Sequence, residues 1–558
     1  MKNWKVAEET SEVKKLAEET GLSLSVCQLL VNRNVKDKEE SQKFLYPKRK
    51  FIHEPSLLPD LEEAVLRIRK AIDNKEKILL FGDYDVDGIT SLAMLSDYFS
   101  KRGVDFFVLI PSRIDDGYGF NKKAFAKAIQ EGATLIIALD CGTNSRLLNE
   151  AKSLGLDVVV VDHHESFKMK RNFLLVNPKR QDSIYPFKEV STGALTFKLI
   201  WALKGIFAYE YLDLVSLSIV CDVAPLLDEN RILVKLGLEK LRTSPCLGIE
   251  SLIKKTTLKS EYIDTFHLGW ILGPRLNASG RISCAYPAFE LLSSDCEQRA
   301  SELAIVLEKN NKQRRQESKE VLNSALAKIE SEVDLRKDYV IVLFEEDWHS
   351  GILGIAASNI KERFSRPTFL ISLKENLGKG SGRSIDNFHL MQALDECRDY
   401  LKDYGGHKKA CGIEIEKDKI NKFREAINEV AKKVLKEKDL ISSLEIDRQI
   451  NFSEITPQFL ETLKLFSPFG EANPEPLFLT KSLKVKNITD KGTDKFVWFQ
   501  EQAGGDANFI YPARIGANNK FFRILEYGQC FDVVYSLKIR SNQPDSQAVL
   551  SLKDVRMS

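Results

Sequence analysis

The stretch LLFGDYDVDGITSLAML at residues 79–95 places three carboxylates, those of Asp83, Asp85 and Asp87, within an otherwise apolar segment. The apolar run before them predicts a buried parallel strand, and Gly88 lets a helix begin close to the end of that strand. Three neighbouring carboxylates repel one another and are driven to bind protons unless a cation shares them. The stretch therefore predicts an α/β fold with a cation site at the end of its first strand.

The same arrangement recurs in three later segments, each an apolar run that we interpret as a strand ending in acidic or imidazole groups. Binding sites in open parallel sheets form at the carboxyl ends of the strands. We therefore expect these side chains to gather at one edge of the sheet. The runs are TLIIALDCG with Asp140, DVVVVDHHES with Asp162, His163 and His164, and SLSIVCDVAP with Asp222.

Carboxylates mixed with imidazoles form a ligand set that suits manganese, with magnesium a poorer match to histidine. Two ions roughly 3.5–4 Å apart can activate water and neutralise a phosphoryl group. The alternative is that these residues are ordinary turn formers, since Asp is common at strand ends. Four such segments in one domain, with tandem histidines after one of them, favour the metal site.

Length and composition indicate a folded protein of several domains, with 558 residues, 43% of them hydrophobic and 29% charged. A net charge of +2 does not exclude nucleic acid as a partner, because basic residues can be confined to one groove. Nine scattered cysteines without a CxxC pair argue against a disulfide framework. No apolar run reaches the length of a membrane span, and the charged start MKNWKVAEETSEVKK lacks the core of a secretion signal. We expect a cytoplasmic protein.

Changes in pattern divide the chain into five segments. Residues 1–75 have a helical pattern, whereas residues 76–284 alternate short apolar runs with amphipathic segments, as in α/β domains. Residues 285–336 are rich in Glu, Lys, Arg, Leu and Ala and predict long connecting helices. A second α/β pattern covers residues 337–440, and short alternating strands in 441–558 predict a small barrel or sandwich.

The motifs DYDVDG, LDCG, VDHHES and IVCDVAP resemble the four motifs of the DHH phosphoesterases. Five further segments resemble those of the family's bacterial single-strand-specific 5′→3′ DNA exonucleases and stand in the expected order. The resemblance implies a parallel-sheet DHH domain, long helices leading to a second α/β domain called DHH-associated, and a C-terminal OB-fold barrel. The five segments are GPRLNASGRI, DWHSGILGIAAS, GKGSGRSI, GGHKKACGIEI and PFGEANPEP.

The resemblance implies two Mn²⁺ ions, with Mg²⁺ as an alternative. Asp85 and Asp140 would hold one ion. The other would be held by Asp87, Asp140, His163 and Asp222, which makes Asp140 the bridge.

Three neighbours of these presumed ligands carry further roles in the resemblance. His164 would contact the substrate phosphate or donate a proton to it. Asp83 and Asp162 would each be either a ligand or a group that orients one.

The resemblance also implies contacts to nucleic-acid phosphates. Ser381 and Arg383 would hold the 5′-terminal phosphate, with backbone N–H groups exposed by the small residues of GSGRS. Asn277 and Arg281 would contact the nucleic-acid backbone or the scissile phosphate. His407 could also meet a phosphate, the alternative being a histidine that is simply hydrogen-bonded.

OB-fold barrels bind single strands by stacking bases on aromatic side chains above a basic groove. The stretch DKFVWFQ offers Phe496 and Trp498 on one face of a strand and Phe499 on the other. The alternative for each ring is the barrel core. The basic residues nearby are Lys486, Lys491 and Lys495.

The function that the resemblance implies is metal-dependent degradation of single-stranded DNA, 5′→3′, to 5′-mononucleotides in DNA repair and recombination. The alternative is a DHH-type phosphodiesterase for short oligonucleotides or cyclic dinucleotides, but those relatives lack the β-rich tail. An inactive scaffold would have lost metal ligands, and all are present here. Besides single-stranded DNA, single-strand-binding protein and a helicase are candidate partners, between which the sequence does not choose.

Overall fold

The chain folds into two compact units in this computed structural model. The larger unit contains Glu54–Ala224 and Leu236–Ser442, and the smaller contains Lys2–His53, Pro225–Lys235 and Ser443–Ser558. The predicted helical segment 1–75 is therefore divided between the units, and it includes a strand as well as helices. The structure describes residues 2–113, 116–117, 119–491, 494–502, 508–516, 521, 524–539 and 548–558, without the side chains of Lys491, Gln502, Asn508 and Ile539.

The first α/β domain contains a parallel five-stranded sheet with the order β3-β2-β4-β5-β6. The order reverses between β2 and β4, and ligands bind beyond the carboxyl ends of the strands at such a switch point. Gly82 lies opposite Leu139, and Leu139 opposite Val161, so the residues that follow all three strands lie at one level. The strands are β2 (Ile78–Gly82), β3 (Phe106–Leu109), β4 (Leu135–Leu139), β5 (Asp157–Val161) and β6 (Leu174–Val176).

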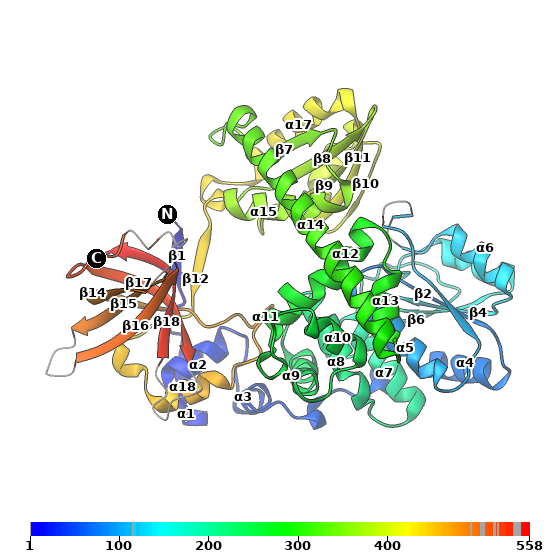
Figure 1. The fold of residues 1–558 in the computed structure, drawn as a ribbon, viewed down its shortest axis with the longest axis horizontal. Coiled ribbons are helices and arrows are strands. Elements are labelled where there is room, and N and C mark those ends of the chain that lie inside the picture. The colour runs from blue at the N-terminus through cyan, green and yellow to red at the C-terminus, as the bar shows by residue number, and fades with distance from the viewer. Residues whose placement is uncertain are drawn as a thin grey trace. The chain divides into compact units, whose positions relative to one another are not determined.

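Helices cover both faces of this sheet, with α6 on one side and α4, α5 and α7 on the other (Figure 1). Because both faces are buried, the strands are continuous apolar runs, which is why the sequence predicted them. The helices of this domain are α4 (Leu61–Asp73), α5 (Val86–Ser100), α6 (Lys122–Glu131), α7 (Thr192–Lys204), α8 (Leu212–Cys221), α10 (Leu247–Lys254), α11 (Thr265–His267), α12 (Gly273–Ile282) and α13 (Tyr286–Ser293), with a π-helical turn at Leu268–Leu272. A further helix, α9 (Asp228–Thr243), belongs to the smaller unit up to Lys235 and to the larger unit from Leu236.

The apolar run before Asp222 is a helix, α8, so the prediction of a strand there was wrong. All residues from Leu212 to Ile219 are buried, and a helix buried on all sides has no polar face to reveal its period. A short apolar run of this kind cannot be assigned to helix or strand by periodicity alone. Asp222 caps the carboxyl end of α8.

The predicted connecting helices are α13 and the 36-residue helix α14 (Glu297–Glu332). The first part of α14 packs on α10, α12 and α13, and its last part on α15 and β7, as Figure 1 shows. Its buried positions Ala300, Leu303, Ala304 and Leu307 follow the helical period and form the stripe that faces these neighbours.

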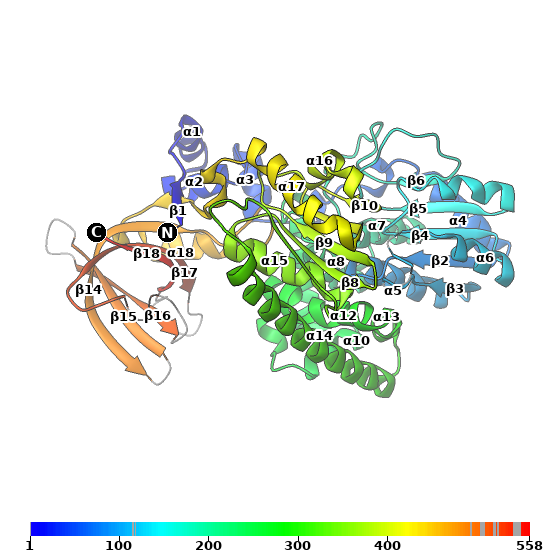
Figure 2. The same ribbon diagram turned by 90° about the horizontal axis from the view of Figure 1, so that it is seen from above.

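The second α/β domain has a mixed five-stranded sheet with the order β10-β11-β9-β8-β7, in which only β7 and β8 pair in parallel. Helix α15 lies on one face, and α16 and α17 pack on the other (Figure 2). Its elements are β7 (Ile341–Glu345), α15 (Leu353–Phe364), β8 (Thr368–Lys374), β9 (Leu377–Arg383), α16 (Leu390–Glu396), β10 (Asp403–Gly406), β11 (Ala410–Glu416) and α17 (Ile420–Val434).

The smaller unit contains a five-stranded barrel of order β14-β15-β16-β18-β17, closed by pairing of β14 with β17. The β16–β18 pair is parallel and the other barrel pairs are antiparallel, which agrees with the predicted OB-fold. The elements of this unit are β1 (Asn3–Val6), α1 (Ser11–Thr20), α2 (Leu24–Val31), α3 (Lys38–Leu45), β12 (Ser443–Ile446), β13 (Arg448–Gln449), α18 (Pro457–Lys464), β14 (Phe478–Lys491), β15 (Asp494–Gln502), β16 (Asn508–Gly516), β17 (Cys530–Ile539) and β18 (Ala548–Met557).

Within the described parts of the chain, no helix combines the length and the apolar character that crossing a membrane requires.

Candidate metal centre and phosphate pocket

Three residues separate the start of helix α5 from the end of β2. Asp85 caps the helix, because its Oδ1 accepts hydrogen bonds from the N–H groups of Asp87 at 3.0 Å and Gly88 at 3.2 Å. A Cβ on Gly88 would lie 2.4 Å from the carbonyl oxygen of Asp83, so only glycine fits. The predicted role of Gly88 in bringing the helix close to the strand end is confirmed.

The Asp87 carboxylate is buried at the amino end of α7. Its Oδ1 accepts hydrogen bonds from the Gly193 N–H at 2.7 Å and the Ser218 hydroxyl at 2.5 Å, and its Oδ2 accepts one from the Thr192 N–H at 2.8 Å. These donors favour the charged form, but burial and the nearby Asp85 raise the pKa of Asp87 to about 6.

Asp140 follows β4 in a left-handed backbone conformation, with φ of 62°. Its Oδ1 accepts a hydrogen bond from the Thr192 hydroxyl at 2.9 Å. Burial, followed by the charges of the surrounding aspartates, raises the pKa of Asp140 well above its ordinary value. A non-glycine residue in this conformation at a strand end is typical of functional sites, where surrounding contacts hold the strained backbone.

The His163 imidazole lies among three carboxylates. Its Nε2 is 3.4 Å from an oxygen of Asp140 and 3.8 Å from one of Asp87, and its Nδ1 is 3.7 Å from one of Asp222. These separations exceed hydrogen-bond lengths. Burial, with a smaller effect of His164, lowers the pKa of His163 to about 3, so the imidazole is neutral and can act as a metal ligand.

Two groups of potential ligand atoms gather here, each with its atoms within 4.8 Å of one another. One oxygen of Asp83 is buried without a hydrogen-bond partner among the described residues, and burial raises the pKa values of Asp83 and Asp222. Buried, mutually repelling carboxylates beside a neutral imidazole fit divalent cations. The first group is Asp83, Asp85 and Asp140, and the second is Asp87, His163 and Asp222.

Asp162 forms a further group with Asp140, His163 and His164, but its oxygens are already occupied. Its Oδ1 accepts from the N–H groups of His163 and His164 and from the His164 ring at 2.6 Å, and its Oδ2 accepts from the Thr143 N–H. Burial alone would raise the pKa of Asp162, but these donors hold it well below its ordinary value. The geometry favours an orienting role for Asp162 over a ligand role, and the side chain that it orients is His164, which is not one of the presumed ligands.

The raised carboxylate pKa values predict how stability depends on pH when no metal is bound. A carboxylate whose pKa is higher in the folded than in the unfolded state stabilises the fold when it is protonated. This stabilisation is complete below the unfolded pKa and is lost as the pH rises through the folded pKa, which is about 6 for Asp87. We therefore expect the chelator-treated protein to melt at a lower temperature at pH ~8 than at pH ~6. His163 acts in the opposite direction, because burial lowers its folded pKa to about 3 while an unfolded histidine titrates near ~6.5, so its destabilising effect at pH ~6 fades by pH ~8. We expect the four raised carboxylates to outweigh this single imidazole; they are Asp83, Asp87, Asp140 and Asp222.

Thermal melting with chelator and with Mn²⁺ at both pH values measures this effect. Mn²⁺ should raise the melting temperature more at the higher pH, where the carboxylates are ionised. Equal melting temperatures of the metal-free protein at the two pH values would contradict a cluster of repelling carboxylates.

Ser381 and Arg383 lie at the amino end of α15. The Arg383 Nη1 donates to the Ser381 hydroxyl at 2.9 Å, and a Cβ on Gly354, in the first turn of α15, would lie 2.5 Å from Arg383 Nη2. Helix amino ends favour anions, and an arginine beside one adds a bidentate donor. The structure thus places both predicted phosphate-binding side chains together.

The backbone N–H groups of GSGRS are not exposed as predicted, and that part of the prediction was wrong. The stretch lies on β9, where Ser381 is paired with Leu370 on one side and Gly412 on the other, so its N–H groups serve the sheet. The glycines have a packing role instead. A Cβ on Gly382 would lie 2.6 Å from the Phe369 ring.

Arg281 and Asn277 lie one turn apart on α12. The Arg281 Nη1 donates to the carbonyl of Gly351 at 3.3 Å, which joins this helix to the second α/β domain. Asn277 is half-buried. His349 accepts a hydrogen bond from the Gly351 N–H, which favours a structural role for that histidine.

Arg113 is a functional candidate that the sequence reasoning missed. Its guanidinium lies 4.8 Å from the centre of the Tyr84 ring. Burial lowers the pKa of Arg281 to about 9 and also lowers that of Arg383, and Arg113 contributes to both shifts, so the three guanidiniums are close. The available signal was its position shortly after β3, at the same sheet edge as the aspartates.

His407 is brought to the metal centre by the turn between β10 and β11. Its ring stacks on that of His164, with centroids 6.0 Å apart. Burial, followed by the charge of His164, lowers the pKa of His407. This histidine is therefore a neighbour of the candidate catalytic group.

The barrel aromatics separate as the alternation predicted. Phe499 is fully buried in the barrel core, which excludes it from stacking on bases. Phe496 and Trp498 are half-buried on the other face, with ring centroids 6.4 Å apart. Of the nearby lysines, Lys486 is exposed and Lys495 half-buried, whereas the side chain of Lys491 lies outside the described residues.

A parallel sheet with clustered carboxylates and a histidine at its switch point, joined to a second domain with a cationic pocket, defines a metal-dependent phosphoesterase of the DHH class. Family models agree with this. Residues 77–219 match the N-terminal domain of the DHH family, residues 337–433 the DHHA1 domain and residues 446–554 the RecJ OB domain. The borders of the five predicted segments stay a prediction.

The chain belongs to the RecJ family of single-stranded-DNA-specific exonucleases. It is 36% identical to the RecJ exonuclease of Bacillus subtilis over 87% of this chain and 62% of that protein. It is 33% identical to the RecJ exonuclease of Dickeya dadantii over 76% of this chain and 78% of that protein.

Solved structures agree with this assignment. The Mn²⁺ complex of RecJ from Thermus thermophilus has a TM-score of 0.83 and 25% identity, and the match covers 100% of this chain and 80% of that chain. An exonuclease RecJ bound to manganese has a TM-score of 0.60 and 31% identity, covering 67% of this chain and 95% of that chain.

Proposed function

We propose that this protein degrades single-stranded DNA in the 5′→3′ direction and releases 5′-mononucleotides, in DNA repair and recombination. The observation that carries the proposal is the pairing of a metal-ligand cluster with a pocket for a terminal phosphate. Arg281 contributes to both, since it lies within electrostatic reach of Asp85 and of Arg383. A phosphate held at the arginines would place the next phosphodiester toward the carboxylates.

The residues of the first α/β domain would bind the ions and prepare the scissile phosphate. Asp83, Asp85 and Asp140 would hold one ion, and Asp87, Asp140, His163 and Asp222 the other. Bound divalent ions supply a water of lowered pKa and neutralise phosphoryl charge.

His164 is suited to donate a proton to the leaving oxygen. Burial lowers the pKa of His164, but the hydrogen bond from its Nδ1 to Asp162 and the charges of Asp162, Asp85 and Asp83 together outweigh burial. The pKa is therefore raised, and the ring carries a proton more readily than an ordinary histidine. Asp162 fixes the orientation of that ring, and the stacked ring of His407 limits its movement.

Substrate choice would follow from the second domain and the barrel. Ser381 and Arg383 of the second domain, together with Arg113 of the first, would bind the 5′-phosphate. In the barrel, Phe496 and Trp498 would stack on bases of the strand. A single-strand-binding protein or a helicase would be a fitting partner, since both present single strands. We place this activity in the cytoplasm, where a bacterial chromosome is repaired.

End-labelled single-stranded DNA tests the proposal. With Mn²⁺, a 5′ label should appear at once in mononucleotide, whereas a 3′ label should stay in long fragments until late. Chelator or a blunt duplex should prevent the release. Activity confined to di- to pentanucleotides would overturn the proposal in favour of a short-oligonucleotide phosphodiesterase.

Arg383→Ala should reduce the preference for 5′-phosphorylated over 5′-hydroxyl ends by about tenfold or more, because a hydrogen bond to a charged group contributes ~1.5–3 kcal/mol. The ratio of kcat/KM for the two substrates measures this. Lys379→Ala is the control, because Lys379 lies four residues before Arg383 on the same strand, β9, and is exposed. Unchanged discrimination in the Arg383 variant would show that the terminal phosphate binds elsewhere.

A further inference from the structure

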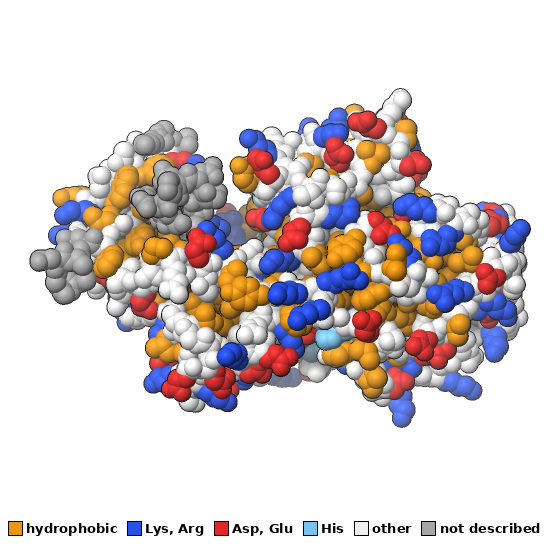
Figure 3. Space-filling model, turned by 90° about the horizontal axis from the view of Figure 1, so that it is seen from below, with side chains coloured by type: hydrophobic (Ala, Val, Ile, Leu, Met, Phe, Trp, Pro, Cys, Tyr) orange, Lys and Arg blue, Asp and Glu red, His pale blue; other side chains and the backbone are white. Residues whose placement is uncertain are grey.

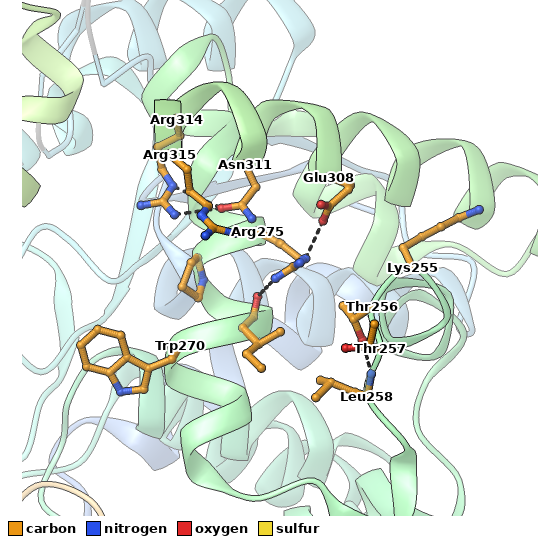
Figure 4. A pocket seen from close by; sticks show the side chains of 12 residues that line it. Lys255, Thr256, Thr257, Leu258, Trp270, Arg275, Glu308, Asn311, Arg314 and Arg315 are labelled. Carbon is orange, nitrogen blue, oxygen red and sulfur yellow. Dashed lines mark hydrogen bonds and ion pairs between the residues drawn. The ribbon is translucent and has the colours of Figure 1, made fainter. Parts of the chain in front are cut away.

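A pocket of about 620 Å³ opens between α10, the π-helical turn, α12 and α14, and it shares no residue with the metal groups. Figure 4 shows Arg275 at its centre, where the guanidinium bonds Glu308 at 2.7 Å and the carbonyl of Ile271 at 2.7 Å. Trp270 lies at one side of this arginine, and Lys255 lies at the other. The pocket is thus built from three stretches, 255–258, 270–275 and 308–315, around a central ion pair.

The pocket carries an excess of positive charge. Four cations line it, and Glu308 is the one acidic residue among its lining. Glu308 is paired with Arg275, and the Arg314 guanidinium donates only to the neutral Asn311 side chain, at 2.9 Å. Within the described chain, no carboxylate partner is recorded for the other three cations. These are Lys255, Arg314 and Arg315.

An exposed aromatic pair borders the same pocket. Trp270 is 74% exposed and Phe266 58% exposed, and their rings stack at 6.4 Å and 26°. Hydrophobic and basic side chains also lie side by side elsewhere on the larger unit (Figure 3), so this mixture alone does not define a site. Here a large exposed ring stands beside a hollow with unpaired cations, which is the combination that binds a base and its phosphate.

We propose that this pocket is a second nucleotide-binding site, in which a base stacks on Trp270 and its phosphate is held by Arg314 and Arg315. The positions 308, 311 and 315 recur at helical spacing, so one face of α14 is directed at the pocket. The ligand chemistry is a nucleotide, supplied either by a released mononucleotide or by a segment of a bound strand. The choice of ligand rests on the proposed function.

A row of arginines connects this pocket to the metal centre. Arg281 is within electrostatic reach of Arg314 as well as of Arg383, and Arg314 is in turn within reach of Arg315 and Arg275. Arg275 and Arg281 stand near the two ends of α12. Arginines in a continuous row repel one another, and a bound polyanion relieves that repulsion. The row therefore supports a nucleic-acid ligand over an uncharged one.

Binding measured without turnover tests the proposal. The full chain with Mn²⁺ is titrated with thymidine 5′-monophosphate and, separately, with a hydrolysis-resistant phosphorothioate strand of about 12 nucleotides. The variants are Arg315→Glu and Trp270→Ala, both at exposed positions that should not disturb folding. Lys312→Glu is the matched control, because it makes the same charge change at an exposed position of α14 outside the pocket lining.

We expect each pocket variant to weaken nucleotide binding by about tenfold or more, and Arg315→Glu to reduce the salt dependence of strand binding by ~0.7 in log–log slope. Loss of mononucleotide binding identifies the free nucleotide as ligand, and loss of strand binding alone identifies a strand segment. Binding unchanged in both variants, an equal loss in Lys312→Glu, or competition by polyglutamate but by no nucleotide would overturn the proposal. Because no cleavage is needed, a failed nuclease assay leaves this test intact.

Discussion

Asp140→Asn is expected to lower nuclease activity by about 10³-fold or more, because metal-based charge stabilisation contributes several kcal/mol and Asp140 belongs to the ligand groups. Asparagine tolerates the φ of 62° at this position and keeps an oxygen for the Thr192 hydroxyl, so the fold should persist. Single-turnover cleavage of 5′-labelled single-stranded DNA measures the effect.

The same substitution should raise the melting temperature of the metal-free protein. Burial and the neighbouring aspartates raise the pKa of Asp140, which means that its charge is unfavourable where it stands. The substitution should also reduce the stabilisation by Mn²⁺. The control is Asp157→Asn, which removes a carboxylate at the amino end of β5, where it pairs with Arg67 at 2.6 Å. Wild-type activity in Asp140→Asn would overturn the ligand assignment.

Arg231→Ala should lower the free energy of unfolding of the smaller unit by about 3–5 kcal/mol, because a buried polar network would lose its hydrogen-bond donor. The Arg231 side chain is buried and bonds five backbone carbonyls at 2.6 to 3.2 Å. Burial lowers its pKa to about 9, so it stays charged at neutral pH. The carbonyls belong to Phe44, Leu465, Phe466, Ser467 and Pro468.

Hydrogen exchange of the barrel strands, together with denaturant unfolding, measures this loss. Arg231→Lys should be intermediate, because an ammonium has three donors and cannot serve five carbonyls. Lys43→Ala is the control in the same unit. It removes an exposed lysine paired with Glu39 and should change the free energy of unfolding by less than ~0.5 kcal/mol. Wild-type exchange in Arg231→Ala would contradict the role of this network.

Much of the metal centre could be predicted because its residues directly follow locally coded elements. Strands β2, β4 and β5 are buried on both faces and are therefore apolar runs, so the residue after each run marks the sheet edge. Asp222 was found because it follows an apolar run, even though that run is a helix and not the predicted strand. The error came from burial on all sides, which removes the polar face of α8.

The sequence by itself determined the domain classes and the groups of carboxylates and histidines, because strand burial and helix caps leave local patterns. Only the tertiary structure decided which polar groups form hydrogen bonds with one another. It showed that the oxygens of Asp162 already accept hydrogen bonds, that the β9 glycines serve packing, and that Arg113 lies near Arg281 and Arg383. It also placed Arg231 among carbonyls of distant segments. Such contacts join residues that are remote in the chain. They depend on how the elements pack, and no local sequence pattern encodes that packing.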